Sequence, residues 1–93
     1  MNEVSVNGKK NIIEVMLYSS PACRYSRMAR DFFIEHNIIF TEYNVLSDYG
    51  RAKEMISVSG QSGIPVIVIV KNGKKDFHVG YDREHLLDAI FRG

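Results

Sequence analysis

One short apolar run restricts the fold of this chain more than any other feature. Residues 65–70, PVIVIV, form its most apolar stretch and are rich in β-branched side chains. A strand that is apolar on both faces belongs in the interior of a sheet, with other elements packed on each side. Asn72-Gly73 follows, and this pair is a strong signal for a two-residue hairpin turn. The sequence therefore predicts a central strand that is paired, through this turn, with a strand at 75–79.

Two more strands and a helix precede the hairpin. Residues 12–18 are mostly apolar on both faces and predict an interior strand, and residues 38–45 predict the next strand. From Cys23 onward, apolar side chains recur at three- and four-residue spacing, which predicts an amphipathic helix of about four turns. Ser20 is the expected cap of this helix. Asn37 is a residue type that ends helices in the left-handed conformation.

Two further helices complete the prediction. The second begins at a cap, Ser47 or Asp48, and ends near Gly60, and the last helix begins at Asp82. Their apolar spacing directs these side chains inward: Tyr49, Ala52, Met55, Ile56, Leu86, Leu87, Ile90 and Phe91. The resulting order, β-α-β-α-β-β-α, predicts an α/β fold in which three helices cover a four-stranded mixed sheet.

Length and charge indicate one domain without a nucleic-acid face. The 93 residues fit a domain at 12–93, preceded by a polar tail or edge segment at 1–11. A net charge of +1 gives no case for binding nucleic acid or a membrane surface. No apolar run reaches the ~18 residues of a membrane span, and the N-terminus lacks the apolar region of a signal peptide. We therefore expect a cytoplasmic monomer.

The single cysteine, Cys23, lies where the first strand gives way to the first helix. One cysteine excludes an intramolecular disulfide and a zinc site built on thiolate pairs. A helix N-terminus stabilises a thiolate, and Arg24 and Arg27 add positive charge. The pKa of Cys23 is therefore expected to fall from ~8.5 into the range of ~3.5 to ~7.5. Such a thiol gains little as an attacking group but leaves a mixed disulfide faster. The opposing interpretation is an inert, buried thiol.

Three segments, in order, resemble the glutaredoxin family of thioredoxin-fold thiol–disulfide oxidoreductases. EVMLYSSPACRYSRMARDFF is similar to the family's first strand, active-site loop and first helix. SGQSGIPVIVI resembles its Val-Pro segment, and HVGYDREHLLDAI resembles its glycine–aspartate segment before the last helix. The resemblance covers residues 12–92 and implies a thioredoxin-like (glutaredoxin) fold.

The resemblance implies a role for each residue at a matching position. Cys23 is the implied nucleophile, and Ser26 takes the position of the resolving cysteine. Pro65 is implied to be cis, forming a wall that faces the nucleophile. The backbone of Ile64 is implied to pair with the cysteinyl part of glutathione. The implied glutathione contacts are Tyr25, Ile64, Pro65, Tyr81 and Asp82.

This chain also departs from the family pattern. Many glutaredoxins carry a lysine, which pairs with a glutathione carboxylate, at the position of Ser20. The candidates to replace that lysine are Arg24, Arg51 and Gln61. Because Ser26 has no sulfur, a second glutathione must release the first from the active-site sulfur. This is a monothiol mechanism.

The remaining charged and aromatic residues are interpreted as structural. Arg27 and Arg30 are expected on the solvated face of the first helix. His36, His78 and His85 are scattered without the spacing of metal ligands, so no metal site is predicted.

These residues support one main hypothesis and leave two alternatives open. The main hypothesis is a monothiol oxidoreductase that reduces glutathione mixed disulfides or protein disulfides, with glutathione or another low-molecular-weight thiol as co-substrate. Such an enzyme serves electron transport in redox homeostasis, and its partners are glutathionylated or disulfide-containing proteins. One alternative is a carrier of a [2Fe–2S] cluster, shared between two copies that each give one cysteine. The other is a redox-inert adaptor that keeps the fold without the turnover.

Overall fold

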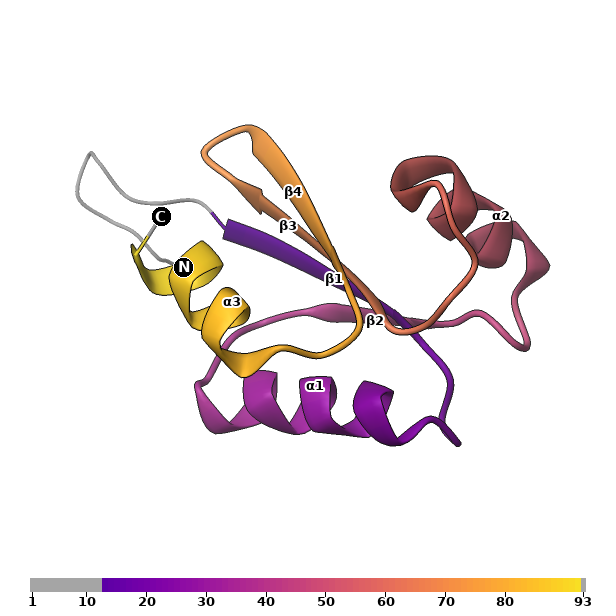
Figure 1. The fold of residues 1–93 in the computed structure, drawn as a ribbon, viewed down its shortest axis with the longest axis horizontal. Helices are drawn as coiled ribbons and strands as arrows, with labels where there is room; N and C mark the ends of the chain where they lie inside the picture. The colour runs from indigo at the N-terminus through magenta and orange to yellow at the C-terminus, as the bar shows by residue number, and fades with distance from the viewer. Residues whose placement is uncertain (1–12, 93) are drawn as a thin grey trace.

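A single mixed sheet of four strands organises the protein (Figure 1). The computed structural model describes residues 13–92, so the predicted tail at 1–11 lies outside the described residues. The elements are β1 (Ile13–Ser19), α1 (Arg24–Glu35), β2 (Thr41–Asn44), α2 (Tyr49–Ser59), β3 (Val66–Lys71), β4 (Lys74–Val79), α3 (Arg83–Leu87) and the π-helical turn η1 (Asp88–Arg92). The predicted order of strands and helices is confirmed, with η1 continuing α3.

The strand pairing brings three chain segments to one end of the sheet. The spatial order is β2-β1-β3-β4, in which β1 runs parallel to β2 and antiparallel to β3, and β3 runs antiparallel to β4. Tyr18 near the end of β1 pairs with Val66 at the start of β3, and Val66 pairs with Val79 at the end of β4. The loop after β1, the loop before β3 and the loop after β4 therefore leave the same end of the sheet.

The helices divide between the two faces of the sheet. Figure 1 shows α1 and α3 on one face and α2 on the other. Because side chains alternate along a strand, the central strands contribute to both layers. The layer under α1 and α3 buries Val15, Leu17, Ala29, Phe32, Phe33, Ile67, Ile69, Leu86 and Ile90. The layer under α2 is smaller and buries Tyr18, Met55, Val66 and Val68.

The predicted hairpin turn, the C-terminal ends of α1 and α2 and the start of α2 are confirmed by backbone geometry and capping. Asn72 and Gly73 have φ values of 52° and 84°, the left-handed pair that a two-residue hairpin of this kind requires. Asn37 follows the end of α1 at φ 56°, and Gly60 ends α2 at φ 75°. Asp48 caps α2 by accepting a hydrogen bond from the Arg51 N–H at 3.1 Å.

Some inward-facing assignments are wrong. Tyr49 is 77% exposed, and Ile56 and Phe91 are also exposed. For Tyr49 and Ile56 the reason is that α2 presses only a narrow strip against the sheet, where Met55 alone is fully buried. Tyr49 begins α2, and its ring instead lies 5.5 Å from the Lys53 ammonium. The strand predicted at 38–45 is also shorter than expected, because pairing with β1 spans only β2.

The burial of two leucines predicts how much stability each loses when it is replaced by alanine. Leu17 is 0% exposed in the layer under α1, whereas Leu46 is 72% exposed. We expect Leu17→Ala to lower the free energy of unfolding by about 2–5 kcal/mol, because it removes apolar contacts and leaves a cavity. Leu46→Ala should change it by no more than about 0.5 kcal/mol. Urea unfolding measures both, and equal losses would contradict this assignment of the core.

Candidate active site

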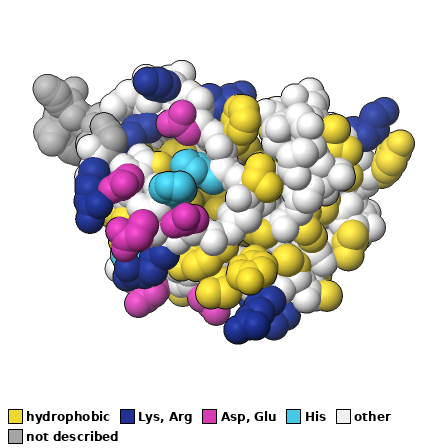
Figure 2. Space-filling view, in the orientation of Figure 1, with side chains coloured by type: hydrophobic (Ala, Val, Ile, Leu, Met, Phe, Trp, Pro, Cys, Tyr) yellow, Lys and Arg dark blue, Asp and Glu magenta, His cyan; other side chains and the backbone are white. Residues whose placement is uncertain are grey.

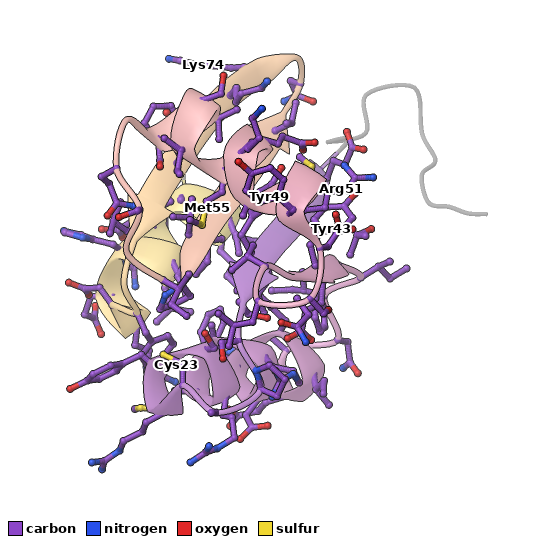
Figure 3. The ribbon with its side chains drawn as sticks, turned by 90° about the vertical axis from the view of Figure 1, so that its right-hand side faces the viewer. Cys23, Tyr43, Tyr49, Arg51, Met55 and Lys74 are labelled. Atoms are coloured by element: carbon purple, nitrogen blue, oxygen red, sulfur yellow. The ribbon has the colours of Figure 1, made fainter. Side chains whose placement is uncertain are left out.

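Cys23 is the N-cap residue of α1, with extended backbone angles (φ −81°, ψ 124°). Its N–H donates to the Ser20 carbonyl at 3.1 Å, and its own carbonyl accepts the Arg27 N–H at 3.1 Å. A tight turn thus carries the chain from β1 into the helix, and the thiol is partly exposed. Figure 3 shows Cys23 at the start of α1. The sulfur is therefore placed among the free N–H groups of a helix terminus.

The prediction that Ser20 caps α1 is wrong. The Ser20 hydroxyl accepts the Ala22 N–H at 3.3 Å, within the turn, and Pro21 lies in the same turn before the helix. The turn closes on the Ser20 carbonyl, which holds this buried serine outside the helix. The N-cap position consequently falls to Cys23, whose side chain makes no capping hydrogen bond.

Hydrogen bonds lower the pKa of Cys23 below its ordinary value. The largest cause is the hydrogen bond from the Ser26 side chain. The backbone N–H groups of Ser26 and Tyr25 add to it, burial opposes it, and the positive charge of Arg27 makes the smallest contribution. Arg24, which was expected to help, is exposed and is not among the groups that lower this pKa. The thiolate is thus held mainly by uncharged donors in its own turn.

The predicted wall beside the site has the expected conformation. The Ile64–Pro65 peptide bond is cis, as the family resemblance implied. The Pro65 carbonyl accepts the Gly80 N–H at 2.8 Å, which fastens the end of β4 to this loop. Among residues 13–92, the backbone N–H and C=O of Ile64 have no hydrogen-bond partner. An extended ligand can therefore pair with Ile64.

Two of the residues expected to replace the family's lysine, Gln61 and Arg51, are held by other contacts. The Gln61 side chain accepts the Gly63 N–H at 2.6 Å and donates to the Gly63 carbonyl at 3.1 Å, so it shapes the loop before Ile64. Figure 3 shows Arg51 beside Tyr43, well away from Cys23. The Arg51 guanidinium lies 4.0 Å above the Tyr43 ring and pairs with Glu54. Arg51 is therefore excluded from the site by its position.

The other predicted glutathione contacts differ in how exposed their side chains are and in whether they already have partners. Tyr25 is 54% exposed on α1, and Arg24 beside it is exposed as well. Tyr81 is half-buried, with its ring 6.3 Å from that of Phe32, and burial raises its pKa. Asp82 caps α3 by accepting the His85 N–H at 3.2 Å, which confirms its structural role.

Figure 2 shows hydrophobic side chains gathered over the middle and lower part of one face, with Lys and Arg at its lower margin.

An ion pair behind the site was not predicted. Arg30 Nε donates to Glu42 Oε1 at 2.8 Å, and the Ser19 hydroxyl donates to Glu42 Oε2 at 2.6 Å. These contacts join α1, β2 and the end of β1, and the hydrogen bond from Arg30 lowers the pKa of Glu42. The expectation that Arg30 lies on a solvated face is wrong. No sequence signal marks this pair, because it depends on the parallel register of β1 and β2.

Within residues 13–92, no group of three or more His, Cys, Asp or Glu side chains is arranged to hold a metal ion. In the same part of the chain, no helix has the length and apolar character needed to cross a membrane.

Comparison with known proteins assigns the family. The sequence model of the glutaredoxin family matches residues 15–74. An uncharacterized glutaredoxin-like 8.6 kDa protein of the rubredoxin operon of Clostridium pasteurianum is 38% identical over 58 residues, which are 62% of this chain and 77% of that protein. The chain belongs to the glutaredoxin family.

Solved structures agree on the fold. Glutaredoxin grx-1 of Archaeoglobus fulgidus superposes with a TM-score of 0.69 at 22% identity, covering 88% of this chain and 89% of that one. Oxidized mitochondrial thioredoxin 3 of Saccharomyces cerevisiae gives 0.65 at 20% identity, covering 88% and 79%. The predicted thioredoxin-like fold is confirmed.

The pKa of Glu42 predicts a pH-dependent stability. A carboxylate whose pKa is lowered on folding stabilises the folded state above its unfolded value, 4.5, and loses that contribution as the pH falls through its lower folded value. We expect Glu42→Gln to lower the free energy of unfolding by about 1–2 kcal/mol at pH 7. The difference from the unchanged protein should shrink below pH 4.5. Urea unfolding across this range tests it, and a difference that is constant with pH would contradict it.

The two neighbouring arginines predict different effects on Cys23. Arg27→Gln should raise the pKa of Cys23, and the rise should diminish at high salt because the charge is solvent-exposed. Arg24→Gln is the matched control and should leave that pKa unchanged. Ultraviolet absorbance of the thiolate against pH measures both variants. A larger effect from Arg24 would show that the charge distribution at the site is not as described.

Proposed function

We propose that this protein is a thiol–disulfide oxidoreductase that reduces glutathione mixed disulfides through Cys23 by a monothiol mechanism. The observation that carries the proposal is the partly exposed Cys23 at the N-cap of α1, whose pKa is lowered by donors of its own turn. Membership of the glutaredoxin family supports thiol–disulfide chemistry at this position. A structural cysteine is buried in apolar surroundings, which raise its pKa.

The proposed reaction has two exchange steps. The Cys23 thiolate attacks the glutathione sulfur of a glutathionylated protein, and the protein sulfur leaves as a thiolate. A Cys23–glutathione disulfide results. The thiolate of a second glutathione then attacks the glutathione sulfur of this adduct, the bond to Cys23 breaks, and the electron pair returns to the Cys23 sulfur. The net products are reduced protein and glutathione disulfide. Because the chain has one cysteine, no internal thiol competes in the second step.

A low pKa favours the second step more than the first. Lowering the pKa of a thiol raises its thiolate fraction at neutral pH. Its intrinsic nucleophilicity falls at the same time, with a Brønsted slope of about 0.4–0.5, so the attack gains little. Departure from a disulfide gains directly, since a low-pKa thiol is the better leaving group. The environment of Cys23 therefore suits a sulfur that accepts glutathione and then passes it on.

We place the glutathione along the loop before β3. The free backbone groups of Ile64 suit pairing with the extended cysteinyl residue of glutathione, which would set its sulfur toward Cys23. The exposed ring of Tyr25 would flank the tripeptide, and Arg24 is an exposed cation available to a glutathione carboxylate. Tyr81 and Asp82 lie beyond Gly80, which is hydrogen-bonded to Pro65, and they complete the proposed groove.

The same features of Cys23 bear on the two alternative functions. The lowered pKa of Cys23 supports chemistry over a redox-inert adaptor. No contact among the described residues favours the shared [2Fe–2S] cluster, and that function stays a prediction.

The proposal predicts a single adduct and a single essential sulfur. After incubation with oxidised glutathione, mass spectrometry should show one glutathione bound per chain, and Cys23→Ser should show none. In a coupled assay with a glutathionylated peptide, Cys23→Ser should lose all turnover, since only this sulfur can form the intermediate. Turnover retained by Cys23→Ser, or no adduct on the unchanged protein, would refute the proposal.

A further inference from the structure

We propose that Gln61 is a positioning residue, whose side-chain amide holds the backbone of Gly63 so that the free polar groups of Ile64 are ready to pair with an extended ligand. The inference rests on the proposed function, because that ligand is the cysteinyl residue of glutathione. It gives Gln61 a role in binding that needs no contact with the ligand.

The Gln61 amide binds both polar groups of the Gly63 backbone. Gln61 Oε1 accepts the Gly63 N–H at 2.6 Å, and Gln61 Nε2 donates to the Gly63 carbonyl at 3.1 Å. An antiparallel strand binds the N–H and C=O of one residue in the same way, so this side chain takes the place of a neighbouring strand. Gly63 is therefore held immediately before the cis Ile64–Pro65 bond. We refer to these two hydrogen bonds as the Gln61–Gly63 pair.

The Gln61–Gly63 pair is anchored to the end of α2. Both the backbone N–H of Gln61 and its Nε2 donate to Ser59 Oγ at 3.4 Å, and the Ser59 hydroxyl donates to the Met55 carbonyl at 2.7 Å. Met55 is 2% exposed in the layer under α2. The conformation of the loop before Ile64 is thus tied, through one serine, to a buried part of the protein.

The same contacts leave no proton of Gln61 for a glutathione carboxylate. A side-chain amide has two N–H protons and one carbonyl oxygen. One proton is donated to the Gly63 carbonyl and the other to Ser59 Oγ. The remaining lone pair on Oε1 cannot bind a carboxylate, because both groups are acceptors. Gln61 therefore acts on the ligand only through the loop.

The loop needs this support because glycine is permissive. Without a Cβ, the backbone of Gly63 has access to many conformations. A ligand that pairs with the backbone binds only the molecules whose loop already has the right conformation, and its apparent dissociation constant rises as that fraction falls. Loss of the Gln61–Gly63 pair should therefore weaken binding. It should leave the pKa of Cys23 unchanged, because the groups that set this pKa lie in another loop.

Gly63 also provides the room that the Gln61 side chain occupies. A Cβ added at Gly63 would lie 2.8 Å from Gln61 Oε1, which is closer than Cβ atoms normally approach. Among residues 13–92, and apart from its chain neighbours, the atoms within 4 Å of this Cβ both belong to Gln61. Gly63 is not among the glycines with positive φ, so its backbone permits alanine. The substitution Gly63→Ala therefore acts on the Gln61–Gly63 pair.

The first test measures binding of S-methylglutathione, which has neither a free thiol nor a disulfide and cannot react with Cys23. Gln61→Ala and Gln61→Met, which keeps the bulk without the amide, should both raise the dissociation constant about tenfold, as expected when two hydrogen bonds are lost. Ser62→Ala, a change at an exposed neighbour in the same loop, is the matched control and should bind like the unchanged protein. In the turnover assay, both Gln61 variants should raise the KM for the glutathionylated peptide without changing kcat or the pKa of Cys23.

The second test is a double-mutant cycle. Gly63→Ala alone should weaken binding of S-methylglutathione, because the new methyl group displaces the Gln61 side chain. The double variant Gln61→Ala/Gly63→Ala should bind no more weakly than Gln61→Ala, because the two changes remove the same contact. Losses of binding that add in the double variant overturn the inference.

The Gly63 amide reports on the pair in the absence of any ligand. Its hydrogen exchange should be slower in the unchanged protein than in Gln61→Ala, because Gln61 Oε1 accepts this N–H. Equal exchange rates in the two proteins overturn the inference.

The outcomes separate this inference from the proposed function. If Gln61→Ala and Gln61→Met bind S-methylglutathione as tightly as the unchanged protein, or if the unchanged protein turns over mixed disulfides without binding it, the inference is overturned and the function stands. If the unchanged protein binds S-methylglutathione but lacks turnover, the function is refuted. Weaker binding by the two Gln61 variants would then still support the positioning role.

Discussion

The antiparallel pairing of β1 with β3 is the constraint on which the rest of the structure depends. The register that sets Tyr18 opposite Val66 places the loop carrying Cys23 at the same end of the sheet as the Ile64–Pro65 bond. Since side chains alternate along a strand, a slip of one residue would send the buried side chains of β1 and β3 to the opposite layers. The apolar character of both strands on both faces allows this pairing to lie in the interior, and the hairpin turn then adds β4, whose end is fastened to Pro65. The register of the sheet therefore determines which loops lie together at the site, and the individual side chains act within that arrangement.

At the site itself, nearby hydrogen-bond donors lower the pKa of Cys23 more than the charge of Arg27 does. The hydrogen bonds that lower the pKa of Cys23 come from Ser26 and Tyr25, within the first turn of α1. Arg27 acts from an exposed position. Salt weakens its electrostatic effect there, because the Debye length near physiological ionic strength is about 8–10 Å. The sequence predicted that the helix N-terminus stabilises the thiolate and that Arg24 and Arg27 add positive charge, but it did not predict the contribution of the Ser26 side chain.

The features that were predictable from the sequence are those determined by neighbours along the chain. The run at 65–70, the turn at Asn72-Gly73 and the cap at Asp48 are local, and the structure confirms them. Most of the features that were missed depend on contacts between distant segments. The Glu42–Arg30 pair requires the register of β2 with β1. The engagement of Gln61 is local, with Gly63, and depends on a loop conformation that the residue types do not specify. The exposure of Tyr49 also follows from tertiary structure, since α2 touches the sheet along one narrow strip.

The division of the interior into two layers separates the two sides of the active site. The helix that carries the sulfur is anchored through Phe32 and Phe33 in the larger layer, whereas Ile64 packs with Met55 in the smaller one. A substitution beneath α2 is therefore expected to alter the packing of Ile64 more directly than the anchoring of α1.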